Sequence, residues 1–561
     1  MNGQQRLELT WIGKENQPKL EPRILIEDPE KSYGDKGTEN MLIFGDNLLA
    51  LKALEQDFTG KVKCIYIDPP YNTGSAFEHY DDGLEHSLWL TLMRDRLTYL
   101  SKLLSIDGLI FLQIDDNEQA YLKVLLDELF GRNNFITSIV WQKKYGSKSD
   151  SKFLSESHEY ILVYAKNKEI AKINRLPRTA EQDARYKNPD NDPRGLWTSG
   201  DLLRNEARDY AIYEIIGPTG KKFLPPSGTS WRFTKERFNE LVQDNRIWFG
   251  QDGSNVPRLK RFLTEVSDSV PATTLWLHTE VGHNDEAKKE IKVLFSDKND
   301  VFATPKPERL IQRVLNLATN PGDLVLDSFL GSGTTAAVAH KLGRRWIGIE
   351  LGEHCHTHCI PRLKKVCDGT DQGGISKTVN WKGGGGYKYY YLAPSLLNQD
   401  EHGNWVISKE YNPQMLAAAM AKQEGFKYCP DENCYWKQGR STEKDYIFTT
   451  TNFITMEYID RIHADIREDE NLLICCKSYE SNADKYPNIT IKKIPAMLLG
   501  RCEFGKEDYS LHIVNMPIDP DAPEFVPVGD EAVNAPKSSK SKQKKNLNLF
   551  ETDEDEGEDE E

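Results

Sequence analysis

The chain has 561 residues, a length that exceeds a single hydrophobic core and predicts about two to four domains. It contains no apolar run of ~18 residues and no charged–apolar–small leader, so we expect no membrane span and no signal peptide. Its nine cysteines are scattered without a paired framework, which is typical of the reducing cytoplasm. The net charge of −15 does not exclude a basic groove for nucleic acid, because the segment 551–561 carries nine carboxylates and leaves −6 for the rest.

Strand-like and helix-like segments alternate in the first part of the chain. The segment 41–54, MLIFGDNLLALKAL, predicts a short strand, a Gly-Asp turn and the start of a helix. Further strands are predicted at 61–68, 107–116 and 158–167, and further helices at 86–104 and 121–130. This alternation predicts a parallel sheet that helices cover on both faces.

The alternation breaks after about residue 170. The segment 170–300 is rich in Asn, Asp, Pro, Gly and Arg, and it contains short aromatic strands such as NRIWFG at 245–250. We interpret it as an inserted domain of a different class. Alternation returns at 306–351, where the order is helix, strand, glycine turn, helix and strand.

The predicted organisation is therefore an α/β core in two halves, followed by a third region. We expect the core halves at 1–169 and 301–370, the insert at 170–300, an α+β C-terminal domain at 371–520 that opens with WKGGGGYKYYYL, and a tail at 521–561. The tail has no pattern able to bury a core, so we expect it to be disordered.

The strand at 61–68 ends in an unusual tetrapeptide, Asp68-Pro69-Pro70-Tyr71. Neither proline can donate to a sheet ladder, and each fixes its own φ near −65°. A rigid strand-ending turn would explain this ending, but such turns are usually built with Gly, Asn or one Pro. The tetrapeptide is therefore a candidate functional motif.

A second motif follows the strand that ends at Asp327, where Gly331-Ser332-Gly333 precedes a helix. Glycines at such a turn let the backbone approach a ligand, and the helix start offers free N–H groups. Alone, Gly331 and Gly333 would fit a nicotinamide-dinucleotide fingerprint, with Glu350 as the ribose-binding acid. A tight structural turn would also fit, so this motif by itself indicates only a nucleoside-containing cofactor.

Together the two motifs are far more specific than either alone. The chain resembles the amino-group DNA methyltransferases that use S-adenosylmethionine and carry a D-P-P-Y tetrapeptide and an F-x-G-x-G turn, here Phe329-Leu330-Gly331-Ser332-Gly333. The catalytic motif precedes the cofactor motif with an insert between them, which is the order of the β group. The flanking segments NMLIFGDNLLALKAL, HSLWLTLMRDRL and TPKPERLI are similar to that group, notably to modification subunits of type III restriction systems.

The resemblance implies a circularly permuted, Rossmann-like S-adenosylmethionine-dependent methyltransferase core with an inserted target-recognition domain. The chemistry of the tetrapeptide agrees with it. The exocyclic amino nitrogen of adenine is a poor nucleophile, and a carboxylate from Asp68 and a carbonyl from Pro69 would each accept one of its N–H groups. Pro69 and Pro70 hold the carbonyl inward, and Tyr71 offers a ring on which an extruded base can stack.

The resemblance also implies the residues that hold the cofactor. Asp327 should bind the methionine amino group, Gly331 and Gly333 should let the backbone pass, and Glu350 should hold the ribose hydroxyls. Asp46 should lie near the adenine and Lys306 near the cofactor carboxylate. The expected cofactor set is Asp46, Lys306, Asp327, Phe329, Gly331, Gly333, Thr334 and Glu350. Relatives often have D-P-F where this chain has Asp327-Ser328-Phe329, which leaves the acid and the ring in place.

The insert interleaves basic and aromatic residues, a pattern that suits phosphate and base contacts but that a solvated face would also show. We expect DNA contacts from Arg232, Arg237, Arg258, Lys260 and Arg261. The stretch EHCHTHC at 353–359 contains potential zinc ligands, but it lies where a covering helix is expected and has no second ligand pair at zinc-finger spacing. We expect no metal, because the proposed chemistry needs none.

We therefore predict a site-specific methyltransferase that modifies the N6 amino group of adenine in duplex DNA, in restriction-modification or phage defence. Methylation of cytosine N4 is the nearest alternative, although relatives of that type usually carry Ser in place of Asp68. A nicotinamide-dependent oxidoreductase would leave the D-P-P-Y tetrapeptide unexplained. A DNA-reading subunit without activity would have no reason to keep both motifs.

The resemblance implies two partners besides DNA. We expect a homodimer, and a restriction subunit that combines helicase and nuclease is a further candidate. The tail suggests a third partner, because its segment NLNLF, 546–550, is similar to peptides that dock on the bacterial sliding clamp, with Leu549 and Phe550 as the residues that would enter its pocket. A tail whose apolar residues pack on its own body, or contact nothing, would explain the same segment without a partner.

Overall fold

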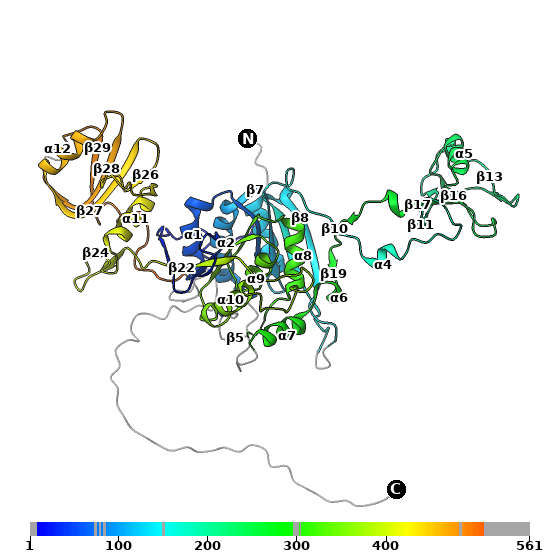
Figure 1. Cartoon of the computed structure of the whole chain (residues 1–561), viewed down its shortest axis with the longest axis horizontal. Helices are drawn as coiled ribbons and strands as arrows, with labels where there is room; N and C mark the ends of the chain where they lie inside the picture. Colours follow the sequence, from blue (N-terminus) through cyan, green and yellow to red (C-terminus); the bar gives the residue numbers. More distant parts are fainter. Residues whose placement is uncertain are drawn as a thin grey trace, which may run out of the picture. The chain divides into compact units, whose positions relative to one another are not determined.

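The computed structural model describes residues 8–71, 76–77, 80–81, 86–147, 152–295, 302, 304–481 and 485–509 (Figure 1). The chain divides into the units Met1–Val514 and Asn515–Glu561. The second unit, with the candidate clamp-docking residues Leu549 and Phe550, lies outside the described residues.

A large mixed sheet forms the centre of the first unit. Its strands lie in the order β1, β22, β3, β21, β20, β4, β7, β9, β8 and β19, and β2 also pairs with β22. The strands are β1 (Leu25–Glu27), β2 (Tyr33–Gly34), β3 (Met41–Phe44), β4 (Val62–Ile67), β7 (Leu104–Ile114), β8 (Phe135–Gln142), β9 (His158–Ala165), β19 (Leu275–Trp276), β20 (Leu324–Asp327), β21 (Arg345–Glu350) and β22 (Gly386–Leu392).

The predicted parallel sheet is confirmed from β22 to β7, where every neighbouring pair is parallel. It is wrong beyond β7, because β9 runs antiparallel to both β7 and β8. A parallel connection needs a crossover, usually a helix. Among the described residues no helix lies between β8 and β9, so the chain returns in the opposite direction. Strand β8 itself was absent from the predicted elements.

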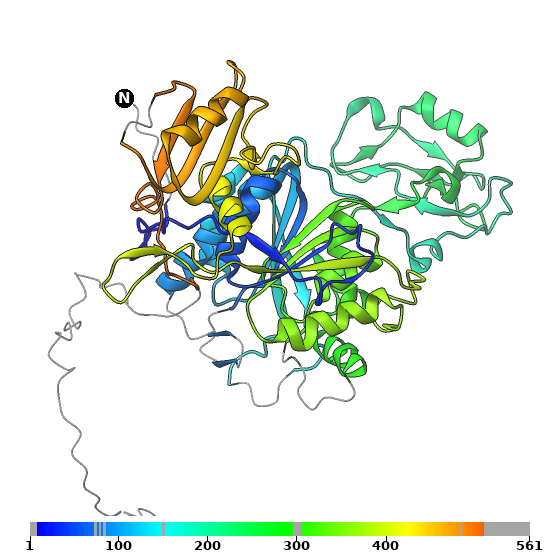
Figure 2. The ribbon, with the colours of Figure 1, turned by 60° about the vertical axis from the view of Figure 1, so that its left-hand side comes forward.

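Helices cover both faces of this sheet, as predicted (Figure 2). Along β4, Cys64 and Tyr66 face one core with α8, α9 and α10, whereas Ile65 and Ile67 face the other with α1, α2 and α3. This alternation follows from the two-residue period of a strand. These elements are α1 (Asn47–Phe58), α2 (His86–Leu103), α3 (Gln119–Leu126), η1 (Asp127–Gly131), η2 (Arg132–Asn134), α8 (Glu308–Ala318), α9 (Thr334–Lys341), η5 (Cys355–Cys359) and α10 (Ile360–Cys367), with the small hairpin β5 (Ala76–Phe77) and β6 (Tyr80–Asp81).

The segment between β9 and β19 folds into small antiparallel sheets around its own core, which contains Trp231, Phe238 and Ile247. Its elements are β10 (Leu176–Pro177), α4 (Ala180–Asp183), β11 (Trp197–Gly200), β12 (Leu203–Arg204), η3 (Asp209–Ala211), β13 (Ile215–Ile216), β14 (Lys222–Phe223), β15 (Ser230–Trp231), α5 (Lys235–Gln243), β16 (Ile247–Trp248), β17 (Arg258–Phe262), η4 (Leu263–Glu265) and β18 (Ser269–Val270).

This insert ends earlier than the predicted residue 300. The strand β19 pairs with β8 of the central sheet, so the chain has returned to the core by Leu275. The helices α6 (His278–Val281) and α7 (Asn284–Leu294) follow.

The third region begins later than the predicted residue 371. The segment Gly386–Leu392 is a strand of the central sheet, parallel to β3, and it extends the core by one strand. Gly386 lies against the backbone of Asp35 so closely that a Cβ there would overlap it, which explains a glycine at this position.

The remaining C-terminal elements form an α+β arrangement, as predicted. A hairpin precedes a five-stranded sheet in the order β25, β26, β27, β28 and β29. The elements are β23 (Leu397–Gln399), β24 (Trp405–Ile407), α11 (Pro413–Gln423), β25 (Lys427–Tyr428), β26 (Gly439–Arg440), β27 (Asp445–Ile454), α12 (Met456–Asp465), β28 (Asn471–Tyr479) and β29 (Ile489–Lys493). All nine cysteines are free thiols. Within the described ranges, every helix is too short or too polar to cross a membrane.

Candidate active site

The two sequence motifs meet at one edge of the central sheet. Strands β4 and β20 are parallel neighbours, with Ile65 opposite Leu326, so their carboxyl ends point the same way. Asp68 follows β4 directly, and Asp327 is the last residue of β20. Glu350 ends β21, the neighbour of β20 on its other side. The carboxyl edge of such a sheet is where ligands bind in open α/β folds.

Asp68 lies in a cluster of charged and hydroxyl groups. The ammonium of Lys306 is 2.6 Å from its Oδ2, and the hydroxyl of Tyr71 donates a hydrogen bond to its Oδ1. On the other side of this pair lies Glu159 of β9, whose Oε2 is 3.1 Å from the Tyr71 hydroxyl and 3.8 Å from the Lys306 ammonium. Tyr71 and Lys306 therefore both lie between the same two carboxylates.

The tetrapeptide itself is held by α2. The indole Nε1 of Trp89 donates a 2.6 Å hydrogen bond to the Pro70 carbonyl, and Pro69 is buried. The Lys306 ammonium also lies 5.4 Å from the centre of the Tyr71 ring, within the range of a cation–π contact. The backbone and the ring of this turn are thus contacted by α2 and by the loop before α8.

The charges of this cluster act on one another. Burial raises the pKa of Asp68, Lys306 opposes that rise, and Glu159 adds to it. For Glu159 burial acts upward, but Lys306 and Lys143 outweigh it and lower the pKa. Asp68 is thus a carboxylate of raised pKa beside Glu159, whose pKa is lowered, and this makes Asp68 the better proton acceptor of the two.

Sequence reasoning missed Glu159, Gln113 and Lys143. Gln113 of β7 donates a hydrogen bond to Glu159 Oε2, and the Lys143 ammonium lies 3.3 Å from Glu159 Oε1. The signal was present, because Glu159 is a charged residue in the apolar strand HEYILVYA, and buried acids are rare unless they are paired.

The glycine turn is closed by Glu350. The Gly331 N–H donates to Glu350 Oε2 at 2.6 Å, and the N–H groups of Leu351 and Gly352 donate to Oε1 at 2.9 and 3.1 Å. Gly331 and Gly333 have φ values of 56° and 80°, so their conformation favours glycine. Helix α9 then begins at Thr334, whose Oγ1 accepts a 2.8 Å hydrogen bond from Arg362.

Asp327 is a buried acid beneath this turn. Burial raises its pKa to about 7, with smaller upward contributions from Asp68 and Glu350, while Thr335 and the Phe329 N–H act downward. The Phe329 N–H donates to Asp327 Oδ1 at 2.9 Å, and the Phe329 side chain is buried. A nearby cation would stabilise the ionised form of such a buried acid.

Asp46 and Lys306 have partners that the sequence did not predict. Asp46 caps α1 by accepting from the Leu49 N–H at 3.0 Å, and it also pairs with Arg96 at 3.3 Å. The Tyr509 N–H donates to it as well. Lys306 lies on the carboxylate of Asp68 rather than apart from it. Contact of either residue with a cofactor stays a prediction.

The histidines of EHCHTHC lie in the π-helix η5 and the residues before it, at the start of α10, where a covering helix was predicted. His356 Nε2 is 2.8 Å from the Tyr389 hydroxyl, and His354 Nε2 is 2.9 Å from Glu350 Oε1. Across the described part of the chain, no group of three or more His, Cys, Asp or Glu residues could hold a metal ion.

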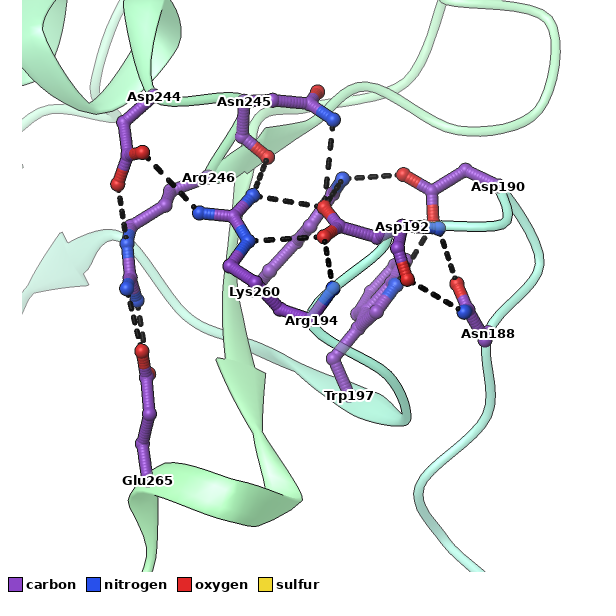
Figure 3. A network of polar contacts seen from close by, with 10 residues as sticks. All are labelled: Asn188, Asp190, Asp192, Arg194, Trp197, Asp244, Asn245, Arg246, Lys260 and Glu265. Carbon is purple, nitrogen blue, oxygen red and sulfur yellow. Dashed lines mark hydrogen bonds and ion pairs between the residues drawn. The ribbon is translucent and has the colours of Figure 1, made fainter.

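The predicted DNA-contacting residues of the insert fall into two groups. Arg232, Arg258 and Arg261 are exposed, and Arg237 is exposed but pairs with Glu240. Lys260 is different, because its side chain is fully buried between Asp190 and Asp192 (Figure 3). Its assignment to the DNA surface is therefore corrected: a buried ammonium held by two carboxylates cannot reach a phosphate without breaking both ion pairs.

The fold and the motifs at the sheet edge define an α/β protein with two adjoining sites after β4 and β20. Residues 62–360, more than half of the chain, match the family model N6_N4_Mtase, described as DNA methylase. The chain belongs to this family of DNA methylases.

Curated relatives are similar over part of their length. The probable type III restriction-modification enzyme HindVI Mod subunit of Haemophilus influenzae is 37% identical over 413 residues, covering 64% of this chain and 54% of the relative. The StyLTI Mod subunit of Salmonella typhimurium is 34% identical over 369 residues, covering 59% and 55%. The chain thus spans about half the length of these relatives.

A solved structure, a putative DNA modification methylase from Thermus thermophilus complexed with S-adenosyl-L-methionine, is 15% identical with a TM-score of 0.31, covering 62% of this chain and 99% of that chain. At this TM-score the likeness adds nothing to the fold described above.

Replacing Lys260 by Met should destabilise the insert by about 3–5 kcal/mol, because Asp190 would keep its charge without a cation and Asp192 would keep only Arg194. Arg261→Met on the same strand is the matched control, since it removes the same charge from an exposed position and should change stability by less than about 0.5 kcal/mol. Calorimetric unfolding of the full chain measures both variants. Equal melting temperatures for the two variants would contradict the structural role of Lys260.

Proposed function

We propose that the chain transfers a methyl group from S-adenosylmethionine to the N6 amino group of adenine in specific duplex DNA. The observation that carries the proposal is the position of the D-P-P-Y tetrapeptide and the glycine turn on the adjacent parallel strands β4 and β20, in a chain that belongs to the DNA methylases. The Mod-subunit names of the relatives support a role in restriction-modification.

The residues at the sheet edge fit this cofactor. A buried Asp327 with a raised pKa suits the methionine amino cation, and Gly331 and Gly333 supply the positive φ values that the turn before α9 requires. We propose that these residues hold it together with Asp46, Lys306, Phe329, Thr334 and Glu350. When bound, S-adenosylmethionine supplies an electrophilic methyl group on a sulfonium.

In this proposal Asp68 and the Pro69 carbonyl accept the two N–H groups of the adenine amino group, and Tyr71 stacks on the extruded base. These two hydrogen bonds localise the lone pair of the nitrogen, and the fixed turn directs that lone pair at the methyl group. After transfer the nitrogen carries one proton too many. Asp68 is placed to accept it, and its raised pKa favours this step.

Lys306 must move before Asp68 can contact the adenine amino group, because the Lys306 ammonium pairs with Asp68 Oδ2. Glu159 offers the nearest second carboxylate, 3.8 Å from the same ammonium. A small movement of Lys306 toward Glu159 would free Asp68 while keeping the cation paired.

We also propose that the core is circularly permuted and that the insert reads the target. Strands β20 and β21 lie between β3 and β4 in the sheet although they come far later in the chain, which supports the permutation. The insert leaves the core after β9 and returns at β19, and its exposed Arg232, Arg258 and Arg261 support DNA contact.

Asp68→Ala should abolish methylation and leave cofactor affinity nearly unchanged, because Asp68 acts on the target amino group. Asp57→Ala, an exposed acid on α1, is the control and should keep full activity. Transfer of labelled methyl to DNA and calorimetric titration of the cofactor measure the two effects. Mass spectrometry of the product nucleosides separates N6-methyladenine from N4-methylcytosine, and activity of Asp68→Ala within tenfold of the wild type would refute the assignment.

Cofactor affinity should rise with pH between about 5.5 and 7.5. Asp327 is protonated below its pKa of about 7, and the neutral acid cannot pair with an amino cation, so each pH unit below 7 should cost up to about tenfold in affinity. Asp327→Asn should bind more weakly without this slope, and Glu350→Ala should bind more weakly and keep it. Titration calorimetry across the pH range checks this, and parallel curves for wild type and Asp327→Asn would show that another group titrates.

We further propose a homodimer, a restriction subunit as partner, and clamp docking through Leu549 and Phe550. These rest on the resemblance, supported for the restriction partner by the names of the relatives. A fully active monomer in light scattering would exclude the dimer.

For the clamp, a 540–561 peptide should pull down purified clamp and a peptide with Leu549 and Phe550 changed to Ala should not. Equal capture by both peptides would exclude docking.

A further inference from the structure

The three-stranded sheet of the insert has two faces of different character. Its strands lie in the order β11, β17 and β16. Ile247 and Leu259 are opposite each other and belong to the core of the insert. Because side chains alternate along a strand, the next pair, Trp248 and Arg258, lies on the other face. This second face is therefore directed away from the apolar core.

A cavity of about 290 Å³ lies on this second face. Two tryptophans form its aromatic part, with the rings of Trp197 and Trp248 5.4 Å apart and steeply inclined. Trp197 is buried, and Trp248 is partly exposed. Besides these two rings, the cavity is lined by Arg185, Lys187, Pro189, Thr198, Ser199, Gly250, Asn255, Val256 and Arg258.

The three cations of the cavity differ from the other basic residues nearby. Arg194 and Arg246 are paired with carboxylates, and so is Lys260. Within the described residues Arg185, Lys187 and Arg258 have no acidic partner, and all three are exposed. Arg258 contacts only the Ser199 hydroxyl, at 3.4 Å. Three unneutralised cations around one aromatic cavity indicate an anionic ligand.

A buried network holds the wall of this cavity (Figure 3). The Trp197 indole Nε1 donates to Asp190 Oδ1 at 2.8 Å, and the other oxygen of Asp190 pairs with Lys260. Lys260 also pairs with Asp192 at 3.0 Å, and Arg194 binds Asp192 through two hydrogen bonds that, with Lys260, hold the pKa of Asp192 well below its usual range. The position of Trp197 is therefore fixed before any ligand arrives.

We propose that this cavity binds one unstacked nucleotide of the DNA target, with its base against Trp248 and its phosphates on Arg185, Lys187 and Arg258. The inference rests on the proposed function, since membership of the DNA methylases is what makes DNA the ligand. An aromatic ring beside cations is the combination that binds bases and backbone of single-stranded nucleic acid. The amide of Asn255 at the rim is the residue type that pairs with an adenine edge.

The volume of the cavity is consistent with this size of ligand. About 290 Å³ is near the low end of ligand pockets, which begin near roughly 300 Å³. A free nucleotide has the same chemistry as a nucleotide within DNA, and the experiment separates these two sources.

The test measures binding of a labelled mixed-sequence duplex to the full chain by fluorescence anisotropy at several salt concentrations. The triple variant Arg185→Ala, Lys187→Ala, Arg258→Ala should bind at least tenfold more weakly, and its salt slope should fall by about 2–3 because up to three phosphate contacts are lost. Trp248→Ala should weaken binding about tenfold, and Trp248→Phe should retain most of it. DNA should also quench tryptophan fluorescence less in Trp248→Phe than in the wild type.

Lys235→Ala is the matched control, because it removes an exposed charge from α5 that does not line the cavity. It should bind within about twofold of the wild type. Equal affinities of the triple variant and Lys235→Ala would overturn the proposal. It would also be overturned if dAMP displaced the duplex, which would indicate a free-nucleotide site, or if RNA of the same sequence bound more tightly.

These binding measurements need no methyl transfer, so their failure is distinguishable from failure of the proposed function. Unchanged cofactor affinity in the triple variant shows that the methyltransferase core is intact. The three mutated side chains are exposed, so the melting temperature should stay that of the wild type. A duplex affinity that stays within twofold in both the triple variant and Trp248→Ala would leave the cavity without a DNA ligand.

Discussion

The arrangement of the whole site depends on the pairing of β20 with β4. These strands are far apart in the chain, yet their parallel register puts Asp327 and Asp68 at the same edge of the sheet. If β20 lay elsewhere in the sheet, the glycine turn and the D-P-P-Y tetrapeptide would each keep its local geometry but would no longer lie side by side. The long segment between β9 and β19 leaves the sheet beyond β7 and returns at its last strand, so it does not come between β20 and β4.

The core and the insert contain the same arrangement of charges, but its consequences differ between them. In each, one lysine lies between two carboxylates, Lys306 with Asp68 and Glu159, and Lys260 with Asp190 and Asp192. Lys260 pairs with both of its acids and its side chain is fully buried, so its removal should lower the stability of the insert. Lys306 contacts one acid at 2.6 Å and the other at 3.8 Å, and the side chain of Asp68 keeps 21% exposure. The proposed movement of Lys306 from Asp68 toward Glu159 rests on this difference.

Much of the core could be predicted from sequence, because its strands are short apolar runs and its helices carry clear periodicity. The segments around β3, α1, β4, α2, β7 and β9 are at the predicted positions. Strand direction could not be predicted, since an apolar run looks the same in a parallel and an antiparallel sheet, and β9 is antiparallel. Strand β22 was assigned to the wrong domain because three glycines precede it and a fourth begins it, and glycines usually mark a boundary. Here Gly386 lets two backbones approach each other.

Prediction from sequence was more limited for the residues of the candidate site than for the strands and helices. Motif residues such as Asp68 and Gly331 could be named because their neighbours in the chain give them a recognisable pattern, whereas Glu159 and Lys143 reach the site only through the fold. The basic residues of the insert are the strongest example. In sequence Arg258, Lys260 and Arg261 are equivalent cations on one short strand, but their alternation and the acids of the 190–192 turn separate them completely. A cation that pairs with an acid supports the fold, whereas an unpaired cation is available to a ligand. The sequence does not reveal this pairing, because the acid can lie some seventy residues away in the chain, as Asp190 does from Lys260.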